Sequence, residues 1–533
     1  MTQIRLVSRL NQILTRPLAT SLEMYRVLGT VLGLLGLGGL AVALYLAPQP
    51  ATLVLVLLGL GLPSLLLLWH RPEFGLLALA FMSSSLIPAN VVDLRLPIGG
   101  GLDLRDLLLI ILLGVVILRE VNRGTLQVPW WPVGGPLLLF LVIAVFSAFY
   151  ALVFEHVGSN WALSELRILS LYTTFFITMW SIKRSEQLKT LLVGLFIITD
   201  LVVLIVYLQQ FFGTEPPLLQ AMLSTQDWRV YPGSGAVRVI PAGQVQMHFM
   251  WFIAIGLLVF ARPNKRLRAF YVVQIMYIGG GHLLAYMRAQ WAAMFIGLVL
   301  IFIILAPKFK HHLAKAAVMA CCLILLIVSV IVDGPLTEVS DTPFIAGIAE
   351  RFGSFLTPSE TAETKSLQWR TFEIEKALQA IRKQPLTGVG LGNRYRELTA
   401  FQSEASGYYT RGSIATDEVS RFTRYVHNSY VSIAVKMGIP GLLALLWFFA
   451  AVLFKGFQIY RNLPDSEDKG VVLGILVSFV GILLWCYFHA HLIKAESTPI
   501  IGLMAALIGN IACIHERGSA SLFNQNRSLR VME

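Results

Sequence analysis

The residue types best suited to chemistry gather where a long polar segment meets an apolar one. His427 and Asn428 stand at this junction, and Arg424 precedes the histidine by three residues. A neutral imidazole can take a proton from a hydroxyl group near neutral pH, because its reference pKa is about 6.5. A guanidinium stays charged and can grip phosphate oxygens with a planar fork of donors. The pattern favours a base beside a cation that can hold an anion such as a phosphate.

Two further arginines lie at the ends of apolar runs. Arg238 comes just before one run, and Arg288 lies in a short turn between two others. Either could hold an anion, or could simply contact lipid headgroups. In the same way, His427 and Asn428 could merely cap the helix that starts after them, since Asn is a favoured N-cap residue.

The composition restricts the class of protein. Of 533 residues, 56% are hydrophobic and 14% are charged, and the mean hydropathy is +0.71. Soluble domains carry roughly 25% charged residues, so a water-soluble enzyme and a disordered chain are both excluded. The net charge of +12 comes from short basic clusters between apolar runs, which is typical of membrane topology and not of nucleic-acid binding.

The apolar runs predict an all-α, polytopic membrane protein of about 14 transmembrane helices with a large, partly helical periplasmic loop, since about 20 apolar residues cross a bilayer. The expected spans are 27–46, 51–69, 74–87, 104–118, 133–152, 167–181, 189–211, 247–260, 270–286, 291–306, 315–332, 430–453, 470–488 and 499–514. Lys and Arg are several times more frequent in alternate connections, which predicts that both termini are cytoplasmic. Nothing before the first run has the form of a cleavable signal, so the first helix is expected to stay in the inner (plasma) membrane.

These spans divide the chain into regions. Residues 27–332 are expected to hold helices 1–11 and residues 430–514 helices 12–14, with cytoplasmic tails at 1–26 and 515–533. The periplasmic loop, 333–429, is too long to lack structure of its own. One helix is expected from Pro343, and another from near Ser366 to just before Pro385. The second should place one stripe of apolar side chains on a surface: Leu367, Ile374, Leu378 and Ile381.

Two stretches of this region carry a family resemblance. The pair His427 and Asn428, followed by Gly438, Pro440 and Gly441, resembles the HN-to-GxxGL signature of the O-antigen ligase and polymerase superfamily. Residues 385–392, with the sequence PLTGVGLG, are similar to the PLxGxGxG stretch of that family. Because these glycines lack the strand and helix of a dinucleotide-binding loop, they predict a tight turn.

The resemblance implies a membrane glycosyltransferase. Members move a glycan from an undecaprenyl-diphosphate carrier to a hydroxyl of a glycan or lipid-glycan acceptor at the periplasmic face, with no metal and no other cofactor. The resemblance assigns the catalytic base to His427 and the grip on the diphosphate to Arg238 and Arg288. We expect Arg424 and Asn428 to contact substrate as well. Ligases and polymerases share this donor chemistry and differ only in the acceptor, so the sequence does not choose between them; we take a ligase as the working expectation.

Other functions remain open at this point. Fourteen helices with intramembrane charges also suit a secondary transporter, and some members of the superfamily carry a bicarbonate-transporter label. A metal-dependent glycosyltransferase would use Asp93, Asp103 and Asp106, although Asp103 or Asp106 could simply cap a helix. A structural scaffold would not need the histidine. Asp200 and Lys436 lie inside apolar runs, and we predict that they pair, because a lone charge in lipid is costly.

Overall fold

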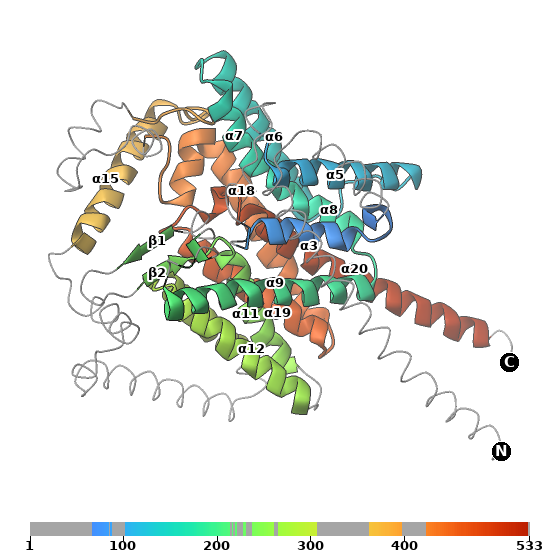
Figure 1. Ribbon diagram of the computed structural model, residues 1–533. Helices are drawn as coiled ribbons and strands as arrows, with labels where there is room; N and C mark the ends of the chain where they lie inside the picture. The colour runs from blue at the N-terminus through green and yellow to red at the C-terminus, as the bar shows by residue number, and fades with distance from the viewer. Residues whose placement is uncertain are drawn as a thin grey trace, which may run out of the picture.

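The computed structural model is built almost entirely of helices, as Figure 1 shows. It describes residues 67–84, 86–87, 102–213, 216, 219–220, 227–230, 237–260, 265–305, 362–396 and 423–530. Within those ranges the one sheet is an antiparallel hairpin of β1 (Asp227–Val230) and β2 (Val237–Ile240). The helices are, in chain order, α3 (Pro72–Met82), α5 (Leu104–Asn122), α6 (Trp131–Val153), α7 (Ser159–Ser170), the 3₁₀ turn η1 (Leu171–Thr173), α8 (Thr174–Ser181), α9 (Ser185–Phe212), α11 (Gln244–Phe260), α12 (Lys265–Leu284), Arg288–Leu305, α15 (Ala362–Lys383), α18 (Ser429–Asn462), α19 (Glu467–Trp485), the 3₁₀ turn η3 (His491–Ile493) and α20 (Thr498–Arg530). This agrees with the expected all-α membrane fold.

Six described helices are long and apolar enough to cross a membrane: Trp131–Val153, Ser185–Phe212, Arg288–Leu305, Ser429–Asn462, Glu467–Trp485 and Thr498–Arg517. The apolar helices α3 and α11 are shorter. The expected spans 27–46 and 315–332, and most of 51–69, lie outside the described residues. The number fourteen, the domain limits and the cytoplasmic termini therefore stay predictions.

Two spans are longer than hydropathy predicts. The run expected at 167–181 begins at Ser159 and passes from α7 through η1 into α8 without a break. The first turns are helical but polar, so an apolar window cannot detect them. Likewise α18, expected to end at 453, continues to Asn462, because its last turns carry polar residues that belong outside the hydrocarbon core.

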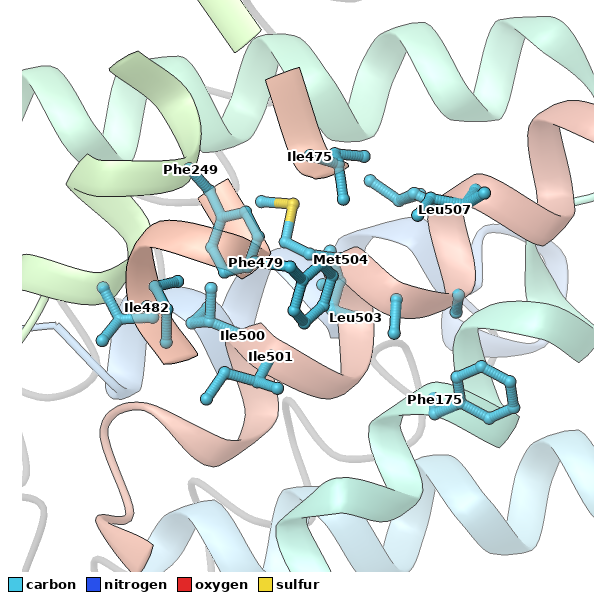
Figure 2. Close-up of a cluster of buried hydrophobic side chains, with 14 of the residues drawn as sticks. Phe175, Phe249, Ile475, Phe479, Ile482, Ile500, Ile501, Leu503, Met504 and Leu507 are labelled. Atoms are coloured by element: carbon cyan, nitrogen blue, oxygen red, sulfur yellow. The ribbon is translucent and has the colours of Figure 1, made fainter. Parts of the chain in front are cut away.

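The core lies where α11, α19 and α20 meet. Figure 2 shows Phe249 of α11 beside Phe479 of α19, with Met504 and Leu507 of α20 close by. All four side chains are fully buried, and the two phenyl rings meet edge to face with centroids 5.1 Å apart. In lipid, the hydrophobic effect does not drive helices together, because the lipid tails are as apolar as the side chains. Close van der Waals packing of this kind is therefore a main attraction between the helices.

Small residues allow α11 and α19 to approach to backbone contact. A Cβ added at Gly256 would meet the carbonyl oxygen of Gly470, and one added at Gly474 would meet the backbone of Ile253. The two glycines of α19 are one turn apart, so they form a flat strip along the helix. This strip fixes the line along which the two helices cross.

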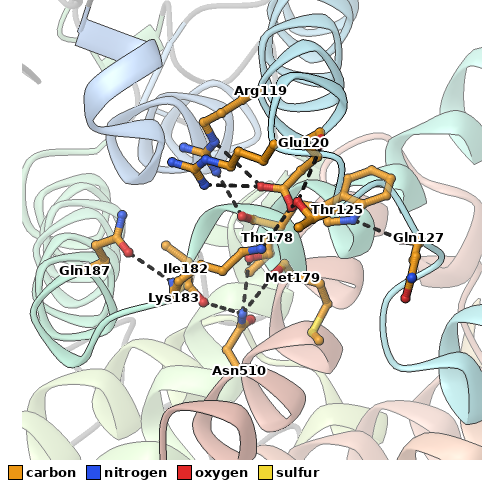
Figure 3. A network of polar contacts seen from close by, with 12 residues as sticks. Arg119, Glu120, Thr125, Gln127, Thr178, Met179, Ile182, Lys183, Gln187 and Asn510 are labelled. Carbon is orange, nitrogen blue, oxygen red and sulfur yellow. Dashed lines mark hydrogen bonds and ion pairs between the residues drawn. The ribbon is translucent and has the colours of Figure 1, made fainter. Parts of the chain in front are cut away.

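A polar network closes one end of the bundle, as Figure 3 shows. The buried carboxylate of Glu120, at the end of α5, accepts hydrogen bonds from Lys183 Nζ (3.1 Å) and Thr125 Oγ1 (3.0 Å). Asn510 of α20 donates to the carbonyl of Ile182 at 2.6 Å. The ends of α5 and α8 thus meet at the level that the charge distribution assigns to the cytoplasmic side.

At the other end, α18 is interrupted at Gly438, where φ is +68°. Pro440 has no N–H, so the carbonyl of Lys436 loses its helical donor. The carbonyl of Val435 loses its donor as well, because the N–H of Ile439 bonds to Pro385 instead (2.8 Å). Buried carbonyls without donors are costly, so the break needs an external partner.

The glycine turn of residues 385–392 supplies that partner. The N–H of Val389 donates to the Val435 carbonyl at 2.8 Å, and the N–H of Gly390 donates to the Lys436 carbonyl at 3.1 Å. Gly388 has φ +65°, and a Cβ there would meet the backbone of α18. The predicted tight turn is therefore confirmed, and its glycines serve close backbone contact.

Lys436 pairs with Glu165, so the predicted pairing with Asp200 is wrong. The Lys436 ammonium lies 2.8 Å from Glu165 Oε1 of α7 and also donates to the carbonyl of Asn393 at 2.8 Å. Asp200 instead accepts a hydrogen bond from Gln274 of α12 (2.9 Å). Hydropathy shows only that two charges lie in apolar runs, and the packing of α7 against the loop decides the partner.

This ion pair predicts an asymmetric loss of stability. Glu165→Leu leaves Lys436 buried without its anion, which should cost about 3 to 5 kcal/mol. Lys436→Met should cost less, because the Glu165 side chain is 28% exposed and can be hydrated. The double variant should recover most of the loss in melting temperature measured in detergent. Asp200→Asn is the matched control and should change little, and a double variant no better than Glu165→Leu would contradict the pairing.

Candidate active site

His427 lies at the end of the long loop, two residues before α18. Its Nδ1 is 2.7 Å from Oε2 of Glu373 on α15, and the Tyr425 ring meets it edge-on with centroids 5.5 Å apart. The His427 side chain is 31% exposed, whereas that of Glu373 is 1% exposed. Because Nδ1 is engaged by the carboxylate, Nε2 is the ring nitrogen available to a hydroxyl group from outside.

Glu373 was not identified from the sequence, because the buried face of this helix follows the predicted apolar stripe only in part: Ile374 and Ile381 are half-buried. The buried face of α15 carries Trp369, Glu373 and Ala377, while Leu378 is 42% exposed. Hydropathy cannot indicate that a glutamate faces inward when its partner is a histidine far away in the sequence. The helix expected from Pro343 lies outside the described residues.

Asn428 caps α18. Its Oδ1 accepts hydrogen bonds from the N–H groups of Tyr430 and Val431, both at 3.0 Å. The capping interpretation is thus correct for Asn428 but not for His427, whose side chain points to α15 instead. A contact between the Asn428 amide nitrogen and substrate stays a prediction.

Arg424 holds the glycine turn against α7. Its Nε donates to the carbonyl of Gly392 at 2.8 Å, and its guanidinium lies 3.8 Å from the centre of the Trp161 ring. Burial, followed by the neighbouring charge of Arg394, lowers the pKa of Arg424, although an arginine remains charged at neutral pH. Arg424 therefore shapes the wall of the site, and its direct contact with substrate stays a prediction.

The other two predicted arginines lie near the same end. Arg288 begins the helix Arg288–Leu305 and is partly buried. Arg238 is on β2, where its register partner is Arg229 of β1, and its side chain lies outside the described part of the chain. Gln244, which opens α11 directly after the hairpin, donates to Met287 Sδ at 2.9 Å and to Gln290 Oε1. The hairpin is thus attached beside Arg288.

An apolar groove connects the Arg288 helix with the His427 segment. It has a volume of about 460 Å³ and is lined by Ala289, Ala292, Ala293, Ile296, Tyr430, Leu453, Val480, Leu483, Leu484, Tyr487 and Phe488. Ala289 is the neighbour of Arg288, and Tyr430 follows His427 by three residues. The hydroxyl of Tyr430 donates to the Leu483 carbonyl at 2.6 Å, which ties α18 to α19 at this level. Neither Arg288 nor His427 lines the groove itself; each lies close in sequence to a residue that does.

The aspartates considered for a metal site are engaged otherwise. Asp103 caps α5 by accepting from the N–H groups of Arg105 and Asp106, as the capping interpretation predicts, and it pairs with the Arg105 side chain at 2.7 Å. Burial raises the pKa of Asp103, but the charges of Arg105 and Arg167 outweigh it and hold the pKa below its ordinary value. In the described part of the chain, no three His, Cys, Asp or Glu residues are grouped to hold a metal. Asp93 lies outside it.

These features define a multi-pass membrane protein with a carboxylate-bound histidine just before one of its long apolar helices and an apolar groove between helices. Residues 273–446 match a protein-family model described as O-antigen ligase. This match supports the resemblance to the O-antigen ligase and polymerase superfamily. The match includes Arg288, His427 and the glycine turn, whereas Arg238 precedes it. No curated protein matches the chain.

The cap on α18 generates a stability prediction. Asn428→Ala should cost about 1 kcal/mol, while Asn428→Asp should keep the stability because aspartate also accepts from the first turn. Thermal unfolding in detergent measures both. Ser466→Ala is the matched comparison: Ser466 caps α19 by accepting from the N–H of Lys469, so its loss should lower the stability in the same way. Equal melting temperatures for Asn428→Ala and the wild type would exclude the capping role.

Proposed function

We propose that this protein is a membrane glycosyltransferase that moves a glycan from an undecaprenyl-diphosphate carrier to a sugar hydroxyl at the periplasmic face of the inner membrane. The observation that carries the proposal is the apolar groove whose lining includes Ala289, the residue after Arg288, and Tyr430, three residues after His427. A lipid-linked donor needs all three: a base, a cation and an apolar surface. The O-antigen ligase match over residues 273–446 supports the same chemistry.

In the proposed reaction, the acceptor hydroxyl attacks the anomeric carbon of the donor glycan. As the new carbon–oxygen bond forms, the hydroxyl proton passes to Nε2 of His427, and the bond from the anomeric carbon to the diphosphate breaks. The lipid diphosphate leaves with the electron pair of that bond. Arg288 and Arg238 are proposed to neutralise the charge that develops on its oxygens, which fixed cations do more effectively than water.

The groove suits the lipid carrier. Its lining is apolar, and the exposed rings of Tyr487 and Phe488 stand where α19 ends. An isoprenoid chain lying along the groove would bring its diphosphate toward Arg288, one residue before Ala289. The anomeric carbon would then lie within reach of His427. The chain's binding energy would serve to orient the reacting groups.

Among the members of this superfamily, we propose a ligase that acts on a lipid-glycan acceptor. A polymerase would use the same donor step and would differ only in the acceptor, a second lipid-linked glycan. The transporter interpretation differs in kind, because uptake of a substrate would need no base at position 427. The choice between these functions depends on which acceptor, if any, takes the glycan.

Removing the base or the cation should strongly lower the rate of transfer. With purified protein, a lipid-diphosphate oligosaccharide and candidate acceptors, His427→Ala should lower kcat by about a hundredfold to ten-thousandfold. Arg288→Ala should lower kcat by about a hundredfold, the usual effect of removing one group that stabilises developing charge. His156→Asn and Arg394→Ala, both exposed residues, are the controls. Transfer should persist in a chelator. Full transfer by His427→Ala would contradict the proposal, and substrate uptake by that variant would favour a transporter.

Filling the groove should weaken donor binding only. Ala292→Trp places an indole among the lining residues, so the KM for the lipid-linked donor should rise about tenfold, the equivalent of about 1.4 kcal/mol. The KM for the acceptor should not change. Leu298→Trp, on an exposed part of the same helix, is the control. An unchanged donor KM in Ala292→Trp would place the lipid chain elsewhere.

A further inference from the structure

The contact between His427 and α15 has a chemical consequence. A free imidazole exists as two tautomers and rotates about its side-chain bonds, so only part of the population presents a basic nitrogen in a given direction. A hydrogen bond at Nδ1 from an acceptor-only carboxylate selects the tautomer with its proton on Nδ1. The lone pair then lies on Nε2.

Glu373 is built to make that bond. Its Oε2 lies 2.7 Å from His427 Nδ1 and 3.4 Å from the His427 backbone nitrogen. Its other oxygen, Oε1, accepts from the indole nitrogen of Trp369 at 3.0 Å. Trp369 lies one helical turn earlier on α15, and both side chains are buried. The carboxylate is therefore fixed at both oxygens.

The charge of Glu373 matters as much as its position. A buried carboxylate is costly unless a positive charge is near. Among the described residues, His427 is the ion-pair partner found for it. The imidazole becomes positive only when it takes a proton. The negative charge of Glu373 is therefore neutralised by His427 only after that proton transfer. The carboxylate thus favours the protonated base more than the neutral one.

We infer that Glu373 is a positioning residue for the base: it orients His427 with Nε2 toward the acceptor hydroxyl and stabilises the imidazolium formed during transfer. This rests on the proposed function. It also gives α15 a role, because this helix carries Glu373 to the histidine that precedes α18. Val435 of α18 packs with Ala377 and Ala380 of α15, and this contact fixes the position of α15, and so of Glu373, along α18.

Other charged groups stand around His427 and must be considered in its pH dependence. On its own segment, Tyr425 packs on the ring, while Arg424 is directed to Trp161 and Gly392. From the chain after η3, Lys494 and Glu496 act on Tyr425 with opposite charges. Burial raises the pKa of Tyr425, so it stays neutral over the range of the assay. Glu373 is the one group of this set that contacts the imidazole nitrogen.

The test compares Glu373→Gln with Glu375→Gln in the full-length protein, using lipid-diphosphate oligosaccharide as donor. Glutamine keeps the shape and an accepting oxygen but removes the charge. We expect Glu373→Gln to lower kcat about a hundredfold, with the KM values for donor and acceptor unchanged. A lowered kcat with unchanged KM values distinguishes a positioning role from a merely structural one. Glu375 is exposed on the same helix, and its variant should behave as wild type.

The outcomes are separable. If His427→Ala is inactive but Glu373→Gln keeps the wild-type kcat, Glu373 is only structural and the inference is overturned. If His427→Ala transfers glycan normally, the proposed function fails first, and the inference fails with it. Should Glu373→Gln not fold, Glu373→Asp keeps the charge but withdraws the oxygen from Nδ1. Its kcat should fall, and full activity of this variant would also overturn the inference.

Discussion

The break in α18 is the constraint on which the loop-bearing end of this protein depends. Inside a bilayer, backbone groups that lose their helical partners must find others within the protein. Gly438 and Pro440 free the carbonyls of Val435 and Lys436, and the only backbone that reaches them in the described residues is the glycine turn at 385–392. A long external loop is thereby attached to a membrane helix at a defined register.

That attachment determines the geometry of the site. The turn directly follows α15, so fixing the turn on α18 also sets where α15 lies. α15 then presents Glu373 to His427, which stands eleven residues before Gly438. On the opposite side of the turn, Glu165 neutralises Lys436, and Arg424 joins Gly392 to Trp161. The buried charges near the loop thus hold the turn, and the imidazole is left with one nitrogen for chemistry.

The apolar groove suggests how one site could bind a substrate that has both a polar reacting group and a lipid chain. Its walls come from Arg288–Leu305 and from the consecutive helices α18 and α19, which lie more than a hundred residues later in the sequence. The hydrogen bond from Tyr430 to Leu483 keeps two of those walls together just below His427. In the proposed function, the polar half of the substrate meets the loop and the apolar half meets the helices.

Composition and local pattern alone determined the membrane class, most of the described helices, the turn at 385–392 and the histidine as the candidate base. These follow from interactions between residues close in the chain: apolar length, capping preference and the freedom of glycine. Tertiary structure decided the partner of Lys436, the inward face of α15 and the presence of Glu373 beside His427. Those are contacts between residues 54 to 271 positions apart. A hydropathy pattern treats every charge as a solvated group, and only packing shows which charge meets which partner.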